Sequence, residues 1–147
     1  MARFKPKART AARKLVLQAL YQWQVTNQDI SVIETQLLED PDRLIIQSLS
    51  KIDVPYFKQI LNGIYQRFDE LDTAYTPWLD RASNELDPIE LAILRIGSYE
   101  LKYCQDIPFK VVINEAVELA KGFGAEKSHK YINGILDQLA KKLKRTN

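Results

Sequence analysis

The stretch DPIELAILRIGSYEL, residues 87–101, carries the clearest helix signal in the chain. Asp87 is a typical N-cap residue, Pro88 fits the first helical position, and Glu90 stands three residues after the cap. We expect this helix to run to about Cys104. Its apolar residues cover almost the whole circumference and are Ile89, Leu91, Ala92, Ile93, Leu94, Ile96, Tyr99 and Leu101. A helix that is apolar on all sides is predicted to be buried, by its own chain or by a partner.

Helices are also expected on both sides of this stretch. The chain has only five glycines and six prolines, and strict alternation of apolar and polar residues is hard to find. We therefore predict an all-α fold of about seven helices. The other six are expected at about residues 7–25, 30–38, 53–67, 69–81, 109–121 and 128–143. Asp29 is expected to cap the second of these, and Asp53 to open the third. Residues 39–51 are mixed in character and are expected to form a connection with room for a turn of helix.

Size and composition predict one domain over residues 1–147. With 46% hydrophobic residues, the chain can bury a core without covalent cross-links. Cys104 is the only cysteine, so no internal disulfide is possible and a cytoplasmic setting is expected. We expect neither a signal segment nor a membrane span, because no run is long and apolar enough.

Charge is strongly segregated along the chain. The first 28 and the last ten residues contain ten of the 21 basic residues and none of the 19 acidic ones. We therefore predict a basic arm at residues 1–9 and a basic tail at residues 141–147. Basic ends on an acidic middle indicate two partners, one polyanionic and one basic. The alternative is that the basic ends only keep the protein in solution.

The stretch KGFGAEKSHKYINGIL, residues 121–136, poses a choice between a phosphate-binding loop and a joint between two helices. A dinucleotide fingerprint needs a preceding strand and a third glycine where Lys127 stands, and a phosphate loop needs Gly-Lys-Ser/Thr. Neither pattern is present. We expect a joint in which Gly122 or Gly124 ends one helix in the left-handed conformation and Ser128 caps the next.

The sequence gives little support to catalysis. His129 and Cys104 are the only residues of their types, so no His/Cys metal cluster can form. A Cys104–His129 nucleophile pair is the catalytic alternative, but a cysteine at the end of an apolar helix is more often a buried, inert thiol. We predict that the chain is not an enzyme and needs no metal or cofactor.

Two polar stripes carry an aromatic ring on the side of a helix that faces away from its apolar stripe. They consist of Lys14, Gln18 and Tyr21, and of Lys127, Tyr131, Gly134 and Gln138. Rings stack on unpaired bases, ammonium groups meet phosphates and amides read base edges, so both stripes predict RNA binding. The alternative is that the helices pack on both sides and that the two tyrosines are interior.

Glu90 is the candidate for contact with a basic protein. It falls on the same side of its helix as Leu94, Gly97 and Leu101, so an acidic group borders apolar residues. The alternative is a carboxylate that favours the positive end of the helix dipole and has no partner.

Three stretches together resemble the NusB family of bacterial transcription antitermination factors. They are ARKLVLQALYQWQ (12–24), DPIELAILRIGSYEL (87–101) and VVINEAVELAKGFGAEKSHKYINGILD (111–137). The last stretch resembles the most recognisable run of the family, N-E-A-x-E-L-A-K, a glycine-bearing turn, then S-x-K-aromatic-[IV]-N-G-[IV]-L. All three occur in the family's order, and the resemblance covers nearly the whole chain.

The resemblance implies an all-helical fold of two three-helix subdomains that share a long helix, without catalytic activity. It implies binding of boxA single-stranded RNA in nascent ribosomal transcripts, together with the small-subunit ribosomal protein NusE. Other Nus factors and RNA polymerase would be indirect partners. The implied RNA-binding residues are Arg9, Arg13, Gln18, Tyr21, Lys121, Lys127, Lys130 and Tyr131. The implied NusE-binding residues are Tyr21, Glu85 and Glu90.

The chain departs from the family pattern in two places. Its N-terminal arm mixes lysine with arginine where relatives often have a denser arginine run, and Tyr131 stands where phenylalanine is expected. Tyrosine also stacks, so the implied role is kept. Two other functions remain open: an RNA-binding domain related to the N-terminal domain of a ribosomal-RNA cytosine methyltransferase, and a helical adaptor that binds only proteins.

Overall fold

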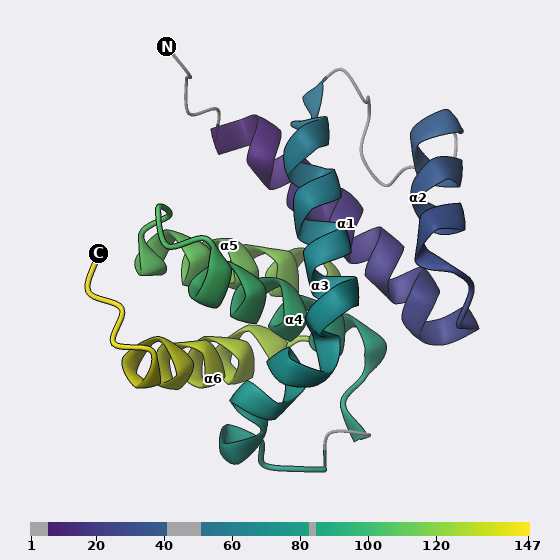
Figure 1. Cartoon of the computed structure of the whole chain (residues 1–147). Coiled ribbons are helices and arrows are strands. Elements are labelled where there is room, and N and C mark those ends of the chain that lie inside the picture. Colours follow the sequence, from purple (N-terminus) through teal and green to yellow (C-terminus); the bar gives the residue numbers. More distant parts are fainter. Residues whose placement is uncertain (1–5, 41–50, 83–84) are drawn as a thin grey trace. The chain divides into compact units, whose positions relative to one another are not determined.

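The computed structural model describes residues 6–40, 51–82 and 85–147, and every regular element in these ranges is helical. This confirms the predicted all-α fold (Figure 1). The elements are α1 (Pro6–Thr26), α2 (Ile30–Glu39), α3 (Val54–Tyr75), the 3₁₀ helix η3 (Thr76–Trp78), α4 (Pro88–Tyr103), α5 (Phe109–Phe123) and α6 (Ser128–Lys142). Most of the predicted connection and of the basic arm, residues 41–50 and 1–5, lies outside the described residues.

One long helix replaces two of the predicted ones. We expected separate helices at 53–67 and 69–81, and the predicted boundary coincides with a kink in α3 at Arg67, whose φ of −131° and ψ of 15° are not helical. The chain stays helical on both sides of that residue, so the described ranges hold six α-helices rather than seven. Pro77 lies beyond α3, at the start of η3, because proline is poorly tolerated in a helix interior.

The chain forms two compact units, residues 1–65 and 66–147, and the boundary falls within α3. α3 therefore belongs to both units, as the predicted shared helix requires. In the first unit the core consists of apolar side chains of α1, α2 and the first half of α3. The most buried are Ala12, Leu15, Val16, Ala19, Leu20, Ile33, Leu37, Phe57, Ile60, Leu61 and Ile64.

The predicted caps of the first unit are confirmed. The Asp29 carboxylate accepts a hydrogen bond from the backbone N–H of Ser31 at 2.9 Å, and Asp53 accepts one from Tyr56 at 3.1 Å. Each carboxylate satisfies a backbone donor that has no partner inside its own helix. Between α1 and α2, Asn27 has a φ of 58°, a left-handed conformation that asparagine tolerates better than most residues.

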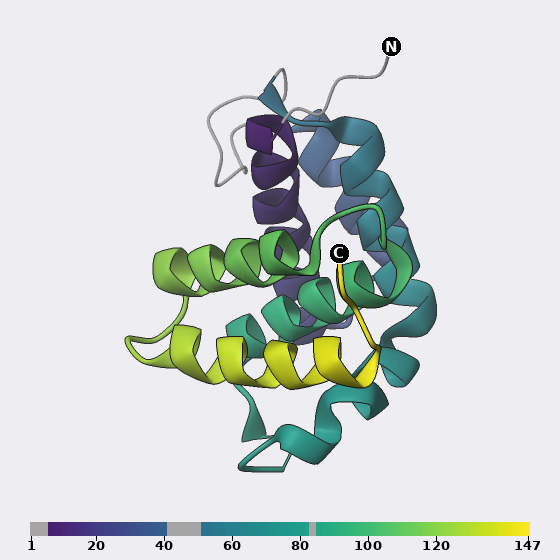
Figure 2. The same ribbon diagram turned by 90° about the vertical axis from the view of Figure 1, so that its left-hand side faces the viewer.

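In the second unit, α4, α5 and α6 pack against one another (Figure 2). Residues 92–101 of α4 are all buried, which confirms the burial predicted from its all-round apolar surface. Gly97 permits the close approach of α4 and α6. A Cβ atom added there would lie 2.6 Å from Cδ1 of Leu136, so only glycine fits without a shift of that leucine.

The joint between α5 and α6 does not use a left-handed glycine. No described glycine has a positive φ, and Gly124 is extended, with a φ of −89° and a ψ of 177°. The prediction was therefore wrong about conformation. Gly124 is favoured by a close contact instead, because an added Cβ would lie 2.9 Å from the carbonyl oxygen of Ala120.

The basic tail is held against the second unit. Arg145 is 8% exposed and donates hydrogen bonds to the carbonyl oxygens of Leu101 and Ile107. The backbone N–H of Phe109 donates to the carbonyl oxygen of Asn147 at 2.8 Å. Arg145 thus satisfies carbonyl groups near the end of α4, while Lys141, Lys142 and Lys144 are exposed.

Candidate nucleic-acid interface

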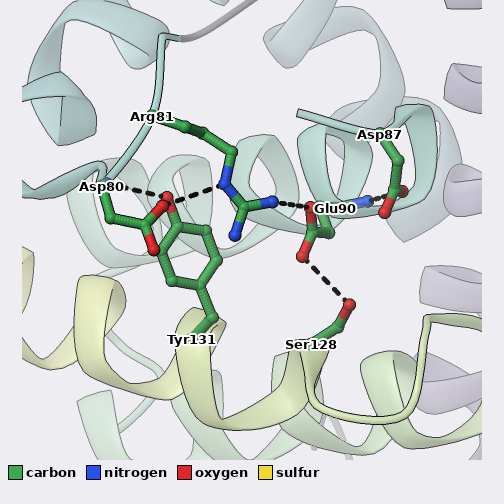
Figure 3. A network of polar contacts seen from close by, with 6 residues as sticks. All are labelled: Asp80, Arg81, Asp87, Glu90, Ser128 and Tyr131. Carbon is green, nitrogen blue, oxygen red and sulfur yellow. Dashed lines mark hydrogen bonds and ion pairs between the residues drawn. The ribbon is translucent and has the colours of Figure 1, made fainter. Parts of the chain in front are cut away.

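Glu90 is positioned by the first turn of α4, within the second unit. The Asp87 carboxylate caps this helix by accepting the backbone N–H of Glu90 at 2.9 Å. The Glu90 carboxylate itself turns away from the cap. It accepts the Ser128 hydroxyl at 3.0 Å and pairs with the Arg81 guanidinium at 3.3 Å (Figure 3). With 5% of its surface exposed, Glu90 joins three segments from inside the unit.

Ser128 is therefore not the cap that the sequence predicted. The N-cap position of α6 belongs to Lys127, and no side chain caps that helix. The Ser128 hydroxyl donates to Glu90 instead, and both residues are buried. A buried carboxylate needs hydrogen-bond donors, and that need decides where the hydroxyl points.

Tyr131 stands on α6 with one face of its ring covered. The Arg81 guanidinium carbon lies 4.6 Å from the centroid of the ring, and the backbone N–H of Asp80 donates to the Tyr131 hydroxyl at 3.1 Å (Figure 3). Arg81 also bonds the Asp80 carboxylate at 2.9 Å. A cation on an aromatic face is attracted by the ring's quadrupole, so these contacts hold Arg81 and Tyr131 together.

These contacts perturb three ionisable groups. Burial is the main cause that raises the pKa of Tyr131, whereas hydrogen bonding to Arg81 lowers the pKa of Asp80. The same hydrogen bond raises the pKa of Arg81. At neutral pH the network thus presents a neutral phenol beneath a guanidinium cation.

Three predicted RNA-binding lysines lie around the α5–α6 joint, next to this network in the chain. Lys121, Lys127 and Lys130 are exposed, and Tyr131 is half-buried. Lys121 makes only a 3.9 Å contact with Glu118, a surface pair that contributes little to stability. The ammonium groups are therefore accessible to a polyanion.

The remaining RNA-binding predictions fall on α1, in the first unit. Tyr21 is 42% exposed, so the alternative that it is an interior residue is wrong. Gln18 is half-buried. Arg9 lies over the ring of Tyr56 at 4.2 Å, and its Nε is 3.8 Å from the carboxylate of Asp53.

Arg13 differs from the other predicted RNA-binding residues because it is buried. Only 2% of its surface is exposed, and its guanidinium lies 5.5 Å from the centroid of the Tyr56 ring. The structure therefore does not present Arg13 to solvent. Helical periodicity placed Arg13 beside Lys14. It could not reveal whether Arg13 or Lys14 would be covered by α3.

The predicted NusE-binding residues also differ from one another. Glu85 is exposed just before α4, and Tyr21 is exposed on α1, whereas the Glu90 carboxylate is engaged inside the second unit. Sequence reasoning missed Arg81 and Asp80, which complete the network. The signal available was weak, since it consisted only of an acid and a base at the end of a predicted helix.

Neither a metal site nor a membrane span emerges from the described ranges. No three His, Cys, Asp or Glu side chains gather there as metal ligands, and no helix there combines the length and apolar character that crossing a membrane requires. Cys104 is a buried free thiol, as expected of an inert cysteine, and His129 is half-buried on α6.

Comparisons with known proteins agree with this architecture. The chain is 53% identical over 137 residues to a protein of Marinomonas sp. (strain MWYL1), covering 93% of this chain and 76% of the relative. It is 50% identical over 141 residues to a protein of Pseudoalteromonas translucida (strain TAC 125), covering 96% of this chain and 99% of that relative. Both relatives are named transcription antitermination protein NusB.

Solved structures show the same fold. NusB of T. maritima superimposes with a TM-score of 0.76 at 29% identity, covering 96% of this chain and 94% of that one. A chain from a structure described as antitermination factors NusB and NusE in complex with dsRNA gives a TM-score of 0.77 at 22% identity, covering 90% of this chain and 96% of that one. A family model described as the NusB family matches residues 10–141. The predicted resemblance is thus confirmed, and the chain belongs to the NusB family.

Proposed function

We propose that this protein is a transcription antitermination factor of the cytoplasm that binds boxA-type RNA in nascent ribosomal transcripts together with NusE. Through that complex it would act with other Nus factors and RNA polymerase to carry transcription past terminators. The observation that carries the proposal is the exposure of Lys121, Lys127 and Lys130 around the α5–α6 joint, close to Tyr131 in the sequence of the second unit. Relatives named as antitermination proteins support it.

The RNA-binding roles follow from the chemistry of each side chain. The three lysines contact phosphates, and the Tyr131 ring stacks on an unpaired base. Because Arg81 already covers one face of that ring, the base would use the other face or stack on the guanidinium plane itself. Arg81 therefore joins the proposed RNA site as a residue that orients Tyr131 and adds positive charge.

On α1, Tyr21 and Gln18 offer a second ring and an amide, and Arg9 adds a cation that the Tyr56 ring holds in place. Arg13 supports this helix from inside the unit and is left out of the contacting set, because it is 2% exposed. Basic residues of the arm before α1 would add phosphate contacts that carry no sequence information.

For NusE binding, exposed Glu85 and Tyr21 are the direct contacts in this proposal. Glu90 acts indirectly. Its buried carboxylate fixes Ser128 and Arg81, and so holds the start of α6 against the segment before α4. Loss of Glu90 would disturb both partner surfaces at once.

The alternative functions have less support. A relative matched along 99% of its own length is named as an antitermination protein, which argues against the methyltransferase-domain reading. The protein-only adaptor is tested by RNA binding. We expect the full chain to retain boxA-type single-stranded RNA on filters, with an affinity that falls steeply as salt rises because lysines displace counterions from phosphates.

Affinity capture with NusE, with and without the RNA, completes the test. We expect the RNA to increase NusE capture. No retention of the boxA-type RNA or of a scrambled control at any salt concentration, together with capture of NusE, would favour the protein-only adaptor instead.

A further inference from the structure

A groove runs between α5 and α6, within the second unit. Its volume is about 430 Å³, within the range of roughly 300–1,000 Å³ typical of sites for small organic groups. Its floor is apolar: Ile113 is buried, and Phe109 and Val117 are half-buried. A flat, uncharged ring can be accommodated on such a floor.

The rim of the groove carries hydrogen-bonding groups that the fold does not use. Asn114 of α5 and Asn133 of α6 both line the groove, and both are exposed. Among the described residues, neither side-chain amide takes part in a hydrogen bond. Each amide offers a donor and an acceptor, which is the pattern that reads the edge of a nucleobase.

The charge at the groove favours an anionic ligand. Lys110 of α5 and Lys130 of α6 contribute ammonium groups, and both are exposed. The acid at the groove, Asp137, is paired with Lys141 at 3.3 Å. Apolar floor, amide rim and net positive charge together fit a nucleotide, with its base on the floor and its phosphate at the lysines.

The groove also connects to the proposed stacking site around the first turns of α6. At about 100° per residue, Tyr131 and Asn133 lie on nearly opposite sides of that helix, and Lys127 and Lys130 fall on the arc between them. Gly134 lies on the same arc, and no atom comes within 4 Å of a Cβ placed there. An RNA strand can therefore cross α6 close to the helix backbone, with Lys127 and Lys130 beneath the RNA phosphates.

We propose that the α5–α6 groove binds an unpaired nucleotide of the same RNA strand that stacks on Tyr131. This inference rests on the proposed function and adds a second nucleotide site to it. Asn114 and Asn133 read the base, Lys110 and Lys130 hold the phosphate, and the strand crosses α6 at Gly134.

The test compares three variants of the full chain by fluorescence anisotropy with a labelled boxA-type RNA. They are the double variant Asn114→Ala/Asn133→Ala, Tyr131→Ala, and Gln59→Ala as a matched loss of one exposed amide in the first unit. We expect about a tenfold loss of affinity for the double variant, in keeping with one lost base contact, and none for Gln59→Ala. The salt dependence of RNA binding by the double variant should stay unchanged, because no phosphate contact is removed.

A second measurement locates the nucleotide directly. RNA with 4-thiouridine at single positions should crosslink to groove residues from one position and to Tyr131 from a neighbouring one. Full affinity in the double variant, with a loss in Tyr131→Ala, would overturn the groove site and leave the proposed function standing. Failure of the unmodified chain to bind RNA would overturn both the groove site and the proposed function. Loss of NusE capture by the double variant without loss of RNA affinity would overturn the nucleotide site and make the groove a protein-binding site.

Discussion

At the scale of single residues, polar partners decide the roles of Ser128, Glu90 and Arg81. Glu90 is almost fully buried, so removing the Ser128 hydroxyl or the Arg81 guanidinium would leave a buried carboxylate with one partner fewer. The same Arg81 covers one face of the ring of Tyr131. A residue inside the unit thus determines how the ring of Tyr131, which we propose binds RNA, is presented.

Tyr131→Ala should weaken RNA binding by about 1–3 kcal/mol if the ring stacks on a base. The stability cost should be smaller than for a core aromatic, because Tyr131 is half-buried and loses mainly its contacts with Arg81 and Asp80. Tyr131→Phe should keep RNA affinity but lower the free energy of unfolding by about 1 kcal/mol, because the hydroxyl no longer accepts the Asp80 N–H. RNA titration and urea unfolding on both variants measure the two effects, and a loss of affinity in the phenylalanine variant would contradict stacking.

Glu90→Lys should destabilise the second unit rather than leave the fold intact. The new ammonium group would face Arg81 in a buried position and would leave the Ser128 hydroxyl without its acceptor. Because the Arg81 side chain is 36% exposed, we expect a loss of about 2–3 kcal/mol, below the range for a fully buried pair. Thermal unfolding measures the loss, with exposed Glu85→Lys as the matched control. Equal stability of the two variants would show that the Glu90 contacts contribute nothing.

At the scale of elements, α4 and α6 approach closely because Gly97 has no side chain. Gly97→Ala brings a Cβ to within 2.6 Å of Leu136, so that buried leucine must change its rotamer. Overpacking of this kind costs about 1–3 kcal/mol, which outweighs the roughly 1 kcal/mol that alanine gains over glycine in a helix. A second substitution, Leu136→Val, should recover part of the loss in a double-mutant cycle. Additive effects of the two changes would mean that they do not share this contact.

The end of α4 depends on the tail through Arg145. Arg145→Met should lower the free energy of unfolding by about 2–4 kcal/mol, because the carbonyl oxygens of Leu101 and Ile107 lose a buried donor. Lys142→Met, which also removes one positive charge, should change stability by less than about 0.5 kcal/mol because Lys142 is exposed. Chemical denaturation measures the free energy of unfolding of the two variants. Equal changes would show that the hydrogen bonds of Arg145 do not stabilise the fold.

At the scale of the whole molecule, charge segregation implies that the arm contributes to every RNA complex. Removing residues 1–5 deletes Arg3 and Lys5 and leaves α1, which begins at Pro6, intact. Affinity should fall for boxA and scrambled RNA alike, and the salt slope should flatten by about 0.7 for each lost phosphate contact. A loss confined to boxA, with an unchanged slope, would show that the arm reads sequence.

Much of the fold was predictable from the sequence, because the signals were local. Periodic apolar residues identified five of the six α-helices to within a few residues, and Asp29, Asp53 and Asp87 were recognised as caps. Caps and amphipathic faces depend on neighbours within one or two turns, so a linear pattern contains them. The boundary predicted after residue 67 coincides with the non-helical Arg67 inside α3, but the second half of α3 ends at Tyr75 and not at residue 81, because Pro77 follows.

By itself, the sequence determined the all-α fold, the buried character of α4 and membership of the NusB family. Only the tertiary structure decided that Ser128 donates a hydrogen bond to Glu90, that Arg145 donates one to the carbonyl oxygen of Leu101, and that the Arg81 guanidinium covers the ring of Tyr131. The first two bonds join residues 38 and 44 positions apart, and the third contact joins different elements. The physical reason is desolvation: a polar group takes whichever partner lies beside it once water has been excluded, and the fold brings that partner from a distant part of the chain.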